Sequence, residues 1–333
     1  MAQLVKMLDY ISRYEKDLSR YPTQYIRLKK YQWERMKTQW ENGADLMEWQ
    51  QEDAEELEEV EGTGRGKWFS PLFRLFGQRR TELVDEEEEV LDPIDDEKNE
   101  EENNFGFNPN IIYNPTNLEQ LRRLYLDQLF HFQIKWASST LMDKSRVDPR
   151  YMRDTLLRSF AQRLPDSFLL FYYPILKLKK APVELDIMMV TPVECMCITV
   201  LEAEDVSAFI GSGDRFWVKK AGENETKLLN PLIALNRMEK IVSGIFNGQE
   251  IDFPVKKYLI SRNGYIDYPG VPYDVTIIDR RTYENWFSTL QKLPVPLKST
   301  QFKAAQAILD IGQTTSISRL FGDQDEQIDE DKL

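Results

Sequence analysis

The sequence predicts an α/β fold: a mixed central sheet flanked by helices, with an α-helical N-terminal region and a disordered acidic insert. The chain has 333 residues, of which 41% are hydrophobic and 12% aromatic, which is enough to fill a core. From residue 117 onward, hydrophobic residues recur first with a helical period, then in short strand-like runs, then with a helical period again. The acidic residues are concentrated in one internal segment and one tail, so the rest of the chain is suited to folding.

Residues 1–50 are predicted to be a helical N-terminal segment. They carry tyrosines and tryptophans among lysines and arginines at near-helical spacing, and they contain a single proline, Pro22. This pattern predicts two helices hinged near Pro22. Aromatic residues mixed with basic ones could also stack on nucleic-acid bases, but this spacing is more typical of packing against another helix.

Residues 51–110 are predicted to be a disordered acidic insert. Residues 51–104 contain 6 basic and 20 acidic residues, a net charge of −14 in a chain whose total is −13. Like-charge repulsion and scarce apolar residues oppose the folding of such a segment. Residues 105–322 contain 27 basic and 23 acidic residues, a net charge of +4, so the low isoelectric point does not argue against a nucleic-acid partner.

A basic and aromatic stretch, KWFSPLFRLFGQRR, lies inside the acidic insert. Its sequence RLFG at 74–77 recurs at 319–322 in an acidic tail, residues 316–333. The repeat has two possible interpretations. It is either a chance match or a helix-capping sequence, or it is a duplicated docking motif. Large aromatic side chains in a disordered stretch are where binding energy concentrates. The predicted partner-docking residues are therefore Trp68, Phe69, Phe73, Phe76 and Phe321.

Residues 111–315 are predicted to form the α/β domain. Asn117, with Gln120 three residues later, is typical of a helix start, and an apolar stripe then runs to Trp136. Asp148 followed by Pro149 predicts a second helix that continues through Phe160. The remaining pattern predicts strands in 167–178, 183–190, 195–202, 215–220, 256–261 and 274–279, and helices over 230–248 and from Ser299 or Thr300 to Gly312.

Several classes of protein are disfavoured by the residues present. Cys195 and Cys197 lie two apart in one predicted strand, a spacing that supports neither a disulfide framework nor a zinc site. His131 is the only histidine, and its apolar helical context is more typical of a core or surface residue than of a catalytic base. No apolar run reaches the roughly 18–20 residues that cross a bilayer, and Asp9 interrupts the N-terminal apolar stretch. We expect a cytoplasmic protein without a membrane partner, since the acidic runs would also be repelled by an anionic leaflet.

Four carboxylates in two consecutive predicted strands form the candidate site. If the two strands form a hairpin centred on Glu194, Asp186 faces Glu202 and Glu184 faces Glu204, with all four side chains on one face. Directly opposed like charges are destabilising, so the cluster would need solvent, shared protons or a cation, and oxygen ligands of this kind suit Mg²⁺ or Mn²⁺. The alternative is that these residues are the solvated ends of two strands in another register.

Several segments of this domain resemble the nuclease-related domain (NERD) family, a bacterial branch of the PD-(D/E)XK nuclease-like folds. They are VELDIMMVTP, the following apolar strand that ends in Glu202, GDRFWVKK and LLNPLIALNRMEKIV, and the resemblance covers about residues 150–290. It implies a PD-(D/E)XK nuclease-like mixed central sheet with helices on both sides. It also implies that Glu184, Asp186 and Glu202 hold a divalent metal. If the chain is an active nuclease, the expected catalytic set is Asp186, Glu202 and Glu204.

The chain also departs from the family pattern. Glu204 stands where the family has a lysine that orients water and stabilises developing charge, although some restriction endonucleases of this fold tolerate glutamate there. The hairpin glycine is missing near Glu194, and Ala234 stands where a glutamine is usual. These departures favour a weakened or lost nuclease. Lys219 and Lys220 could approach a phosphate backbone, although exposed lysine pairs on strands are usually only solvated.

The leading hypothesis is therefore a degenerate or divergent nuclease-related protein that binds DNA or a DNA-processing partner. One alternative is an active Mg²⁺-dependent nuclease, in which a metal-bound hydroxide attacks phosphorus. Another alternative is a protein-interaction adaptor that uses the acidic insert and the RLFG segments.

Overall fold

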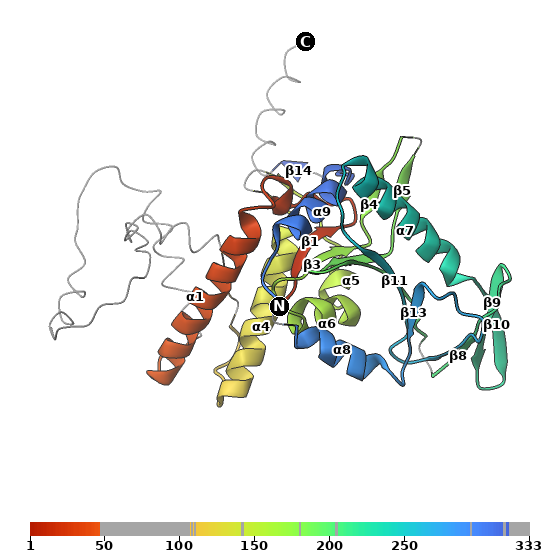
Figure 1. Ribbon diagram of the computed structural model, residues 1–333. Helices are drawn as coiled ribbons and strands as arrows, with labels where there is room; N and C mark the ends of the chain where they lie inside the picture. The colour runs from red at the N-terminus through yellow and green to blue at the C-terminus, as the bar shows by residue number, and fades with distance from the viewer. Residues whose placement is uncertain are drawn as a thin grey trace, which may run out of the picture. The chain divides into compact units, whose positions relative to one another are not determined.

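The computed structural model describes residues 1–46, 107, 109, 111–140, 143–179, 181–203, 206–293, 295–315 and 318–319 (Figure 1). The chain divides into two compact units, one formed by Met1–Ile26 with Tyr125–Leu333 and the other by Arg27–Leu124. Helices α1 (Tyr21–Glu41) and α4 (Leu118–Trp136) each cross the boundary between them. Nearly all of the predicted acidic insert, with its docking residues Trp68, Phe69, Phe73 and Phe76, and Phe321 of the tail lie outside the described residues.

The first unit is built around a six-stranded central sheet with the strand order β1-β3-β6-β7-β11-β13. β6 runs antiparallel to its two neighbours β3 and β7, whereas β11 is parallel to β7, β13 to β11, and β1 to β3. The predicted mixed central sheet is thereby confirmed. The strands are β1 (Gln3–Met7), β3 (Leu169–Tyr172), β6 (Ile187–Val190), β7 (Cys195–Val200), β11 (Val255–Ile260) and β13 (Val275–Ile278).

Helices cover both faces of this sheet, as predicted. On one face, Lys257 of β11 donates from Nζ to Asn236 Oδ1 of α7 (Pro231–Gly248) at 2.7 Å. On the other face, the ring of Tyr258 lies 6.1 Å from that of Trp286 in α8 (Tyr283–Gln291). α9 (Ser299–Asp310) packs against α7 and β6, and α6 (Thr155–Arg163) stacks Phe160 on Phe287 of α8 at 6.3 Å. The sequence pattern missed α8 but predicted α7 and α9.

The N-terminal region differs from the predicted pair of helices. All five residues of β1 are buried in the central sheet, and a fully buried strand shows the same continuous apolar pattern as a buried helix. The short 3₁₀ helix η1 (Arg13–Glu15) follows, and then a single helix, α1, begins at Tyr21. Pro22 lies in its first turn, where the missing N–H costs no hydrogen bond, so the predicted hinge at Pro22 is wrong.

The aromatic residues of this region that lie in the first unit pack inside it. The rings of Tyr14, Tyr21 and Tyr25 lie 5.9, 5.5 and 6.1 Å from the ring of Trp136 in α4. Tyr25 also contacts α4 through its hydroxyl, to which Gln133 Nε2 donates at 2.5 Å. For these residues the packing interpretation is confirmed.

The helix predicted from Asp148 through Phe160 is interrupted. α5 (Pro149–Met152) ends after one turn, and α6 begins at Thr155 with its own N-cap, Asp154. Asp148 caps α5 as expected, accepting from Arg150 N at 2.9 Å. Two consecutive Asp caps therefore divide the predicted helix.

A second, four-stranded sheet has the order β10-β9-β8-β12, and we call it the small sheet. Its strands are β8 (Ala208–Ile210), β9 (Phe216–Ala221), β10 (Asn224–Leu229) and β12 (Tyr265–Asp267), of which only β9 was predicted. Two short pairs complete the unit, β4 (Ile175–Lys177) with β5 (Pro182–Glu184) and β2 (Asp143–Lys144) with β14 (Ser318–Arg319).

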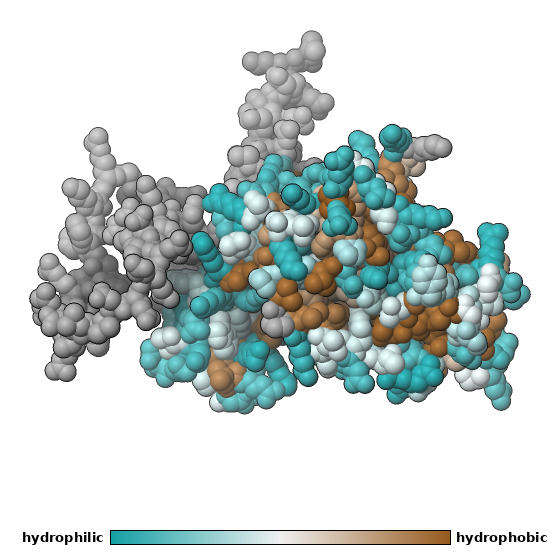
Figure 2. Space-filling model, viewed as in Figure 1, coloured by the Kyte–Doolittle hydropathy of each residue, from teal (hydrophilic) through white to brown (hydrophobic). Residues whose placement is uncertain are grey.

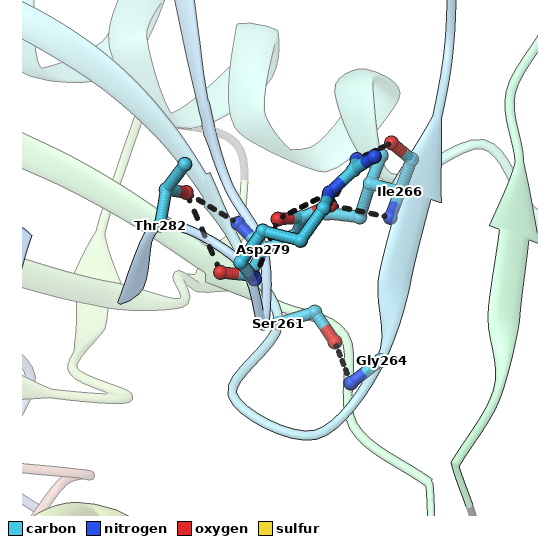
Figure 3. A network of polar contacts seen from close by, with 6 residues as sticks. Ser261, Gly264, Ile266, Asp279 and Thr282 are labelled. Atoms are coloured by element: carbon cyan, nitrogen blue, oxygen red, sulfur yellow. Dashed lines mark hydrogen bonds and ion pairs between the residues drawn. The ribbon is translucent and has the colours of Figure 1, made fainter. Parts of the chain in front are cut away.

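A buried carboxylate joins the small sheet to the central sheet (Figure 3). Asp279 follows β13, is 3% exposed, and accepts from the backbone N–H of Ile266 in β12 at 3.3 Å and from Arg281 Nε at 2.9 Å. Nearby, Gly264 N donates to Ser261 Oγ at 3.1 Å. A Cβ on Gly264 would lie 2.7 Å from the Phe209 ring, so the close approach requires glycine.

The second unit contains the continuation of α1 from Arg27 and the first residues of α4. Trp40 Nε1 donates to the Pro115 carbonyl at 2.8 Å, and Leu46 N donates to Asn114 Oδ1 at 3.1 Å. These bonds tie the end of α1 to the segment that precedes α4. Across the described parts of both units, no helix combines the length and apolar character needed to span a membrane.

Candidate functional site

The candidate site lies where β3, β7 and β11 end and the antiparallel strand β6 begins, and we call this end of the central sheet the carboxyl edge. Side chains from strand ends and from the first turn of α6 gather there. They are Asp154, Tyr172, Tyr173, Asp186, Thr199, Glu202 and Arg262.

The β6–β7 hairpin has a different register from the one predicted. Val190 pairs with Cys195 and Ile187 with Ile198, so the partner residue numbers sum to 385 and not to 388. The turn is centred on Pro192 and Val193, and Thr191 accepts the backbone N–H of Glu194 on its Oγ1 at 3.1 Å. Proline favours the second position of such a turn, which moves the centre away from Glu194. The predicted pairing of Asp186 with Glu202 is therefore wrong.

Extending the β3–β6 register by two residues and the β6–β7 register by one aligns Tyr173, Asp186 and Thr199 across three neighbouring strands. Thr199 Oγ1 donates to Asp186 Oδ2 at 2.5 Å. The position opposite Asp186 thus carries a hydroxyl, where the prediction placed a second carboxylate. The described residues give the other oxygen of Asp186, Oδ1, no hydrogen bond.

Asp154 reaches the carboxyl edge from the start of α6. Its Oδ1 accepts from the backbone N–H groups of Leu156 and Leu157 at 2.9 and 3.0 Å. Its Oδ2 accepts from the hydroxyl of Tyr172 at 2.6 Å. Both carboxylate oxygens therefore hold local structure.

Glu202 is paired with Arg262, which follows β11. The guanidinium forms a two-point contact with the carboxylate, through Nε and through Nη2 at 2.7 Å from Oε2. Nη2 also donates to Thr155 Oγ1 at 3.2 Å, so the arginine bridges β7 to the first turn of α6. The hydrogen bonds to Glu202 raise the pKa of Arg262 above its ordinary value.

Tyr173, which directly follows β3, interacts electrostatically with these charges. Burial raises the pKa of its phenol to about 12, and the carboxylates of Asp186, Asp154 and Glu202 contribute in that order. Its backbone has φ of +48°, a conformation that costs a non-glycine residue free energy and is concentrated at functional sites. A neutral phenol that interacts electrostatically with three carboxylates is the main chemical feature of the edge.

The structure separates the other predicted site residues from this cluster. Glu184 is exposed at the end of β5, in a separate two-stranded pair opposite Ile175. Glu204 lies outside the described residues. Lys219 and Lys220 are on β9 of the small sheet and point to opposite faces, and Lys220 is paired with Glu225 at 2.6 Å.

The donor groups of the carboxyl edge determine how a divalent metal could bind there. Within the described ranges, no three carboxylate, imidazole or thiol groups come together closely enough to enclose an ion. Mg²⁺, however, is usually held by one or two carboxylates together with waters and phosphate oxygens. Asp186, with one oxygen still available, fits that more open mode, whereas the predicted set of Glu184, Asp186 and Glu202 does not gather.

Sequence reasoning missed Asp154, Tyr173, Thr199 and Arg262. Asp154 followed by Thr155 is a helix-start signal that the preceding Asp148–Pro149 signal masked. Thr199 follows directly from the register once Pro192 is placed in the turn. No local pattern marks Arg262, because its partner is 60 residues away in sequence. His131, the single histidine, is exposed on α4 beside Phe130 and has no contact with the edge among the described residues.

Comparison with known proteins gives one distant similarity. No family model matches the chain, and no solved structure matches it significantly. A segment of 133 residues, 40% of this chain, is 32% identical to a protein of Geobacillus stearothermophilus described as an RNA 2',3'-cyclic phosphodiesterase. The matched segment spans 36% of the length of that relative.

Proposed function

We propose that this chain is a divergent nuclease-like protein that binds nucleic-acid phosphodiesters at the carboxyl edge and cleaves them slowly or not at all. The observation that carries the proposal is that Asp154, Asp186 and Glu202 all lie at the carboxyl edge, held there by hydrogen bonds to Tyr172, Thr199 and Arg262 respectively. Sites that handle phosphate use oxygen ligands for a cation, or cationic donors. The carboxyl edge offers both.

The charge of the edge determines how a phosphodiester could approach it. Three carboxylates against one guanidinium leave a net charge of about −2, which repels a phosphate unless a cation neutralises it. Asp186 would hold Mg²⁺ or Mn²⁺ jointly with the phosphate oxygens, and the bound cation would neutralise the phosphate charge. Arg262 could donate to the same phosphate through Nη1, because its Nε and Nη2 already bind Glu202 and Thr155. We therefore expect nucleic-acid binding that depends on a divalent cation.

The existing contacts of the carboxylates support weak or absent cleavage. Asp154 caps a helix, Asp186 accepts from Thr199, and Glu202 is paired with Arg262. A general base works best with a pKa near the operating pH, whereas the phenol of Tyr173, with its pKa raised to about 12, stays protonated near neutrality. The role of Glu204, and the NERD resemblance itself, remain predictions.

A second candidate function is hydrolysis of phosphodiesters at RNA ends. It is favoured by the similarity of a 133-residue segment to the protein described as an RNA 2',3'-cyclic phosphodiesterase. A cyclic phosphate is also a phosphodiester and would need the same neutralising cation or arginine. The two candidates differ in substrate and turnover, and so one set of assays separates them.

The test is fluorescence anisotropy with labelled single- and double-stranded DNA and RNA, with Mg²⁺, with Mn²⁺ and with chelator. We expect a divalent cation to raise affinity by about tenfold or more. Asp186→Asn should remove that increase, because it removes the charge that holds the cation. Asp267→Asn, an exposed carboxylate on β12, is the matched control and should bind as wild type does.

Parallel incubations analysed on denaturing gels measure cleavage. Efficient cation-dependent cleavage, with many turnovers per chain, that is lost in Asp186→Asn would replace the proposal with the active-nuclease alternative. Opening of RNA 2',3'-cyclic phosphate ends without internal cleavage would favour the second candidate. Folded wild type that binds no nucleic acid, or binding that Asp186→Asn leaves unchanged, would overturn the role of the carboxyl edge.

A further inference from the structure

The small sheet ends in an open edge strand, β10. It pairs with β9 on one side, and the part of the chain that the structure describes places no strand on its other side. Five of its six residues are exposed and Leu228 is half-buried. Along such an edge, every second residue directs its backbone N–H and C=O groups away from the sheet, where they can pair with another strand.

β10 lacks two of the structural devices that prevent edge pairing, a bulge and a proline, although it carries the charged residues Glu225 and Lys227. Its register with β9 is continuous from Asn224 to Leu229, without a bulge, and the strand contains no proline. Figure 2 shows a mixed surface at the β9–β10 end of the molecule, with hydrophobic areas among hydrophilic ones. Leu229 and its pairing residue Phe216 contribute apolar surface there, at 51% and 49% exposed.

The charges of β10 are complementary to those of a second β10. A two-fold axis perpendicular to the sheet would pair two β10 strands antiparallel and keep the same face of both sheets on one side. Two residues that lie directly opposite each other would then be both odd-numbered or both even-numbered. With the axis at Thr226, Glu225 faces the partner's Lys227, and Lys227 faces the partner's Glu225. With the axis at Lys227, the two Lys227 side chains would face each other, which is destabilising. With the axis at Glu225, the two Glu225 side chains would face each other, and Lys227 would face only Glu223 of the turn that precedes β10.

We propose that two copies of this chain associate through β10, with Thr226 on the two-fold axis. The pairing joins two four-stranded sheets into one continuous sheet and satisfies the open backbone groups of both edges. Leu229 then lies opposite the partner's Glu223, so part of its exposed surface is covered. Since a single strand pair is a small interface, the association is weak and depends on concentration.

The test is sedimentation velocity of the full chain over a range of concentrations, with two charge variants. Lys227→Glu and Glu225→Lys each place like charges opposite each other twice in the pairing, so each should weaken self-association by about tenfold or more. An equimolar mixture of the two variants should restore association, because each altered strand then faces the opposite charges in its partner. Loss of the exposed Lys220–Glu225 pair in one variant has little effect on stability.

Lys240→Glu is the control, since it makes the same charge change at an exposed position on α7. It should associate as wild type does. A wild-type chain that stays monomeric at every concentration would overturn the proposal. So would charge variants that associate normally, or a mixture that fails to restore association while circular dichroism shows both variants folded.

Discussion

At the scale of single residues, the carboxyl edge combines stabilising contacts with unfavourable features. The φ of +48° at Tyr173 costs free energy, and so does the mutual repulsion of the carboxylates Asp154, Asp186 and Glu202 at the same edge. The hydrogen bonds of Thr199 to Asp186 and of Tyr172 to Asp154, at 2.5 and 2.6 Å, offset part of that cost. A purely structural sheet end would not require such charge crowding, which is why we place the candidate site here.

The pH dependence of stability should report the environment of Tyr173. The folded pKa of about 12 exceeds the unfolded value of about 10, so the unfolded state releases its proton first as pH rises. The contribution of Tyr173 to stability is therefore fully present below pH 10 and is lost as pH rises through 12. In Tyr173→Phe, the free energy of unfolding should fall less steeply with rising pH above 10. The difference in slope corresponds to the release of at most one proton on unfolding. Urea denaturation at a series of pH values measures this slope.

Two further variants show whether the carboxylates act on this phenol. Asp186→Asn should bring the pKa of Tyr173 closer to 10, because Asp186 makes the largest electrostatic contribution of the three carboxylates to that pKa. Tyrosinate absorbance during an alkaline titration measures the change. Tyr273 is fully exposed, so Tyr273→Phe is the control and should leave the stability slope unchanged. An unaltered slope in Tyr173→Phe would contradict the buried, charge-surrounded position of the phenol.

At the scale of elements, the two consecutive Asp caps of α5 and α6 provide a matched comparison. Asp154→Ala removes two cap hydrogen bonds and leaves the buried hydroxyl of Tyr172 without its acceptor. We expect a loss of about 2–3 kcal/mol in the free energy of unfolding. Asp148→Ala removes one cap bond at a more exposed site, at a cost of about 0.5–1 kcal/mol.

Chemical denaturation of both cap variants measures the difference. The midpoints should shift unequally while the denaturant dependence stays the same. Equal losses would mean that the Tyr172 hydrogen bond contributes nothing to stability, and that Asp154 acts only as a helix cap.

The same elements show which features of the fold the sequence could predict. Helix α7 was found because Asn230, Pro231 and the glycine at 248 mark its two ends locally. β1 was missed because a strand buried on both faces has no alternation, and its pairing with β3 depends on residues more than 160 positions away. The prediction of the candidate site was wrong at the hairpin. An error of three residues in the register placed Glu202 opposite Asp186, where the structure has Thr199.

At the scale of the whole molecule, charge is distributed along the chain by segment. Residues 51–104 carry a net charge of −14 in a chain of −13, so the remainder carries +1. A tethered acidic segment could compete with nucleic acid for cationic groups, or it could dock a basic partner. The adaptor hypothesis and the binding hypothesis therefore predict different consequences of removing the same residues.

Deleting residues 51–104 should strengthen nucleic-acid binding, because the chain then repels phosphate less. The gain should be largest at low salt and fall as ionic strength rises, since screening shortens the reach of these charges. Anisotropy titrations at several salt concentrations measure it, with Asp186→Asn in the deleted chain as the control for the carboxyl edge. An unchanged affinity together with loss of a protein partner would instead support the adaptor role of the aromatic stretch at 67–80. If neither affinity nor any partner interaction changes, both roles of the insert are wrong.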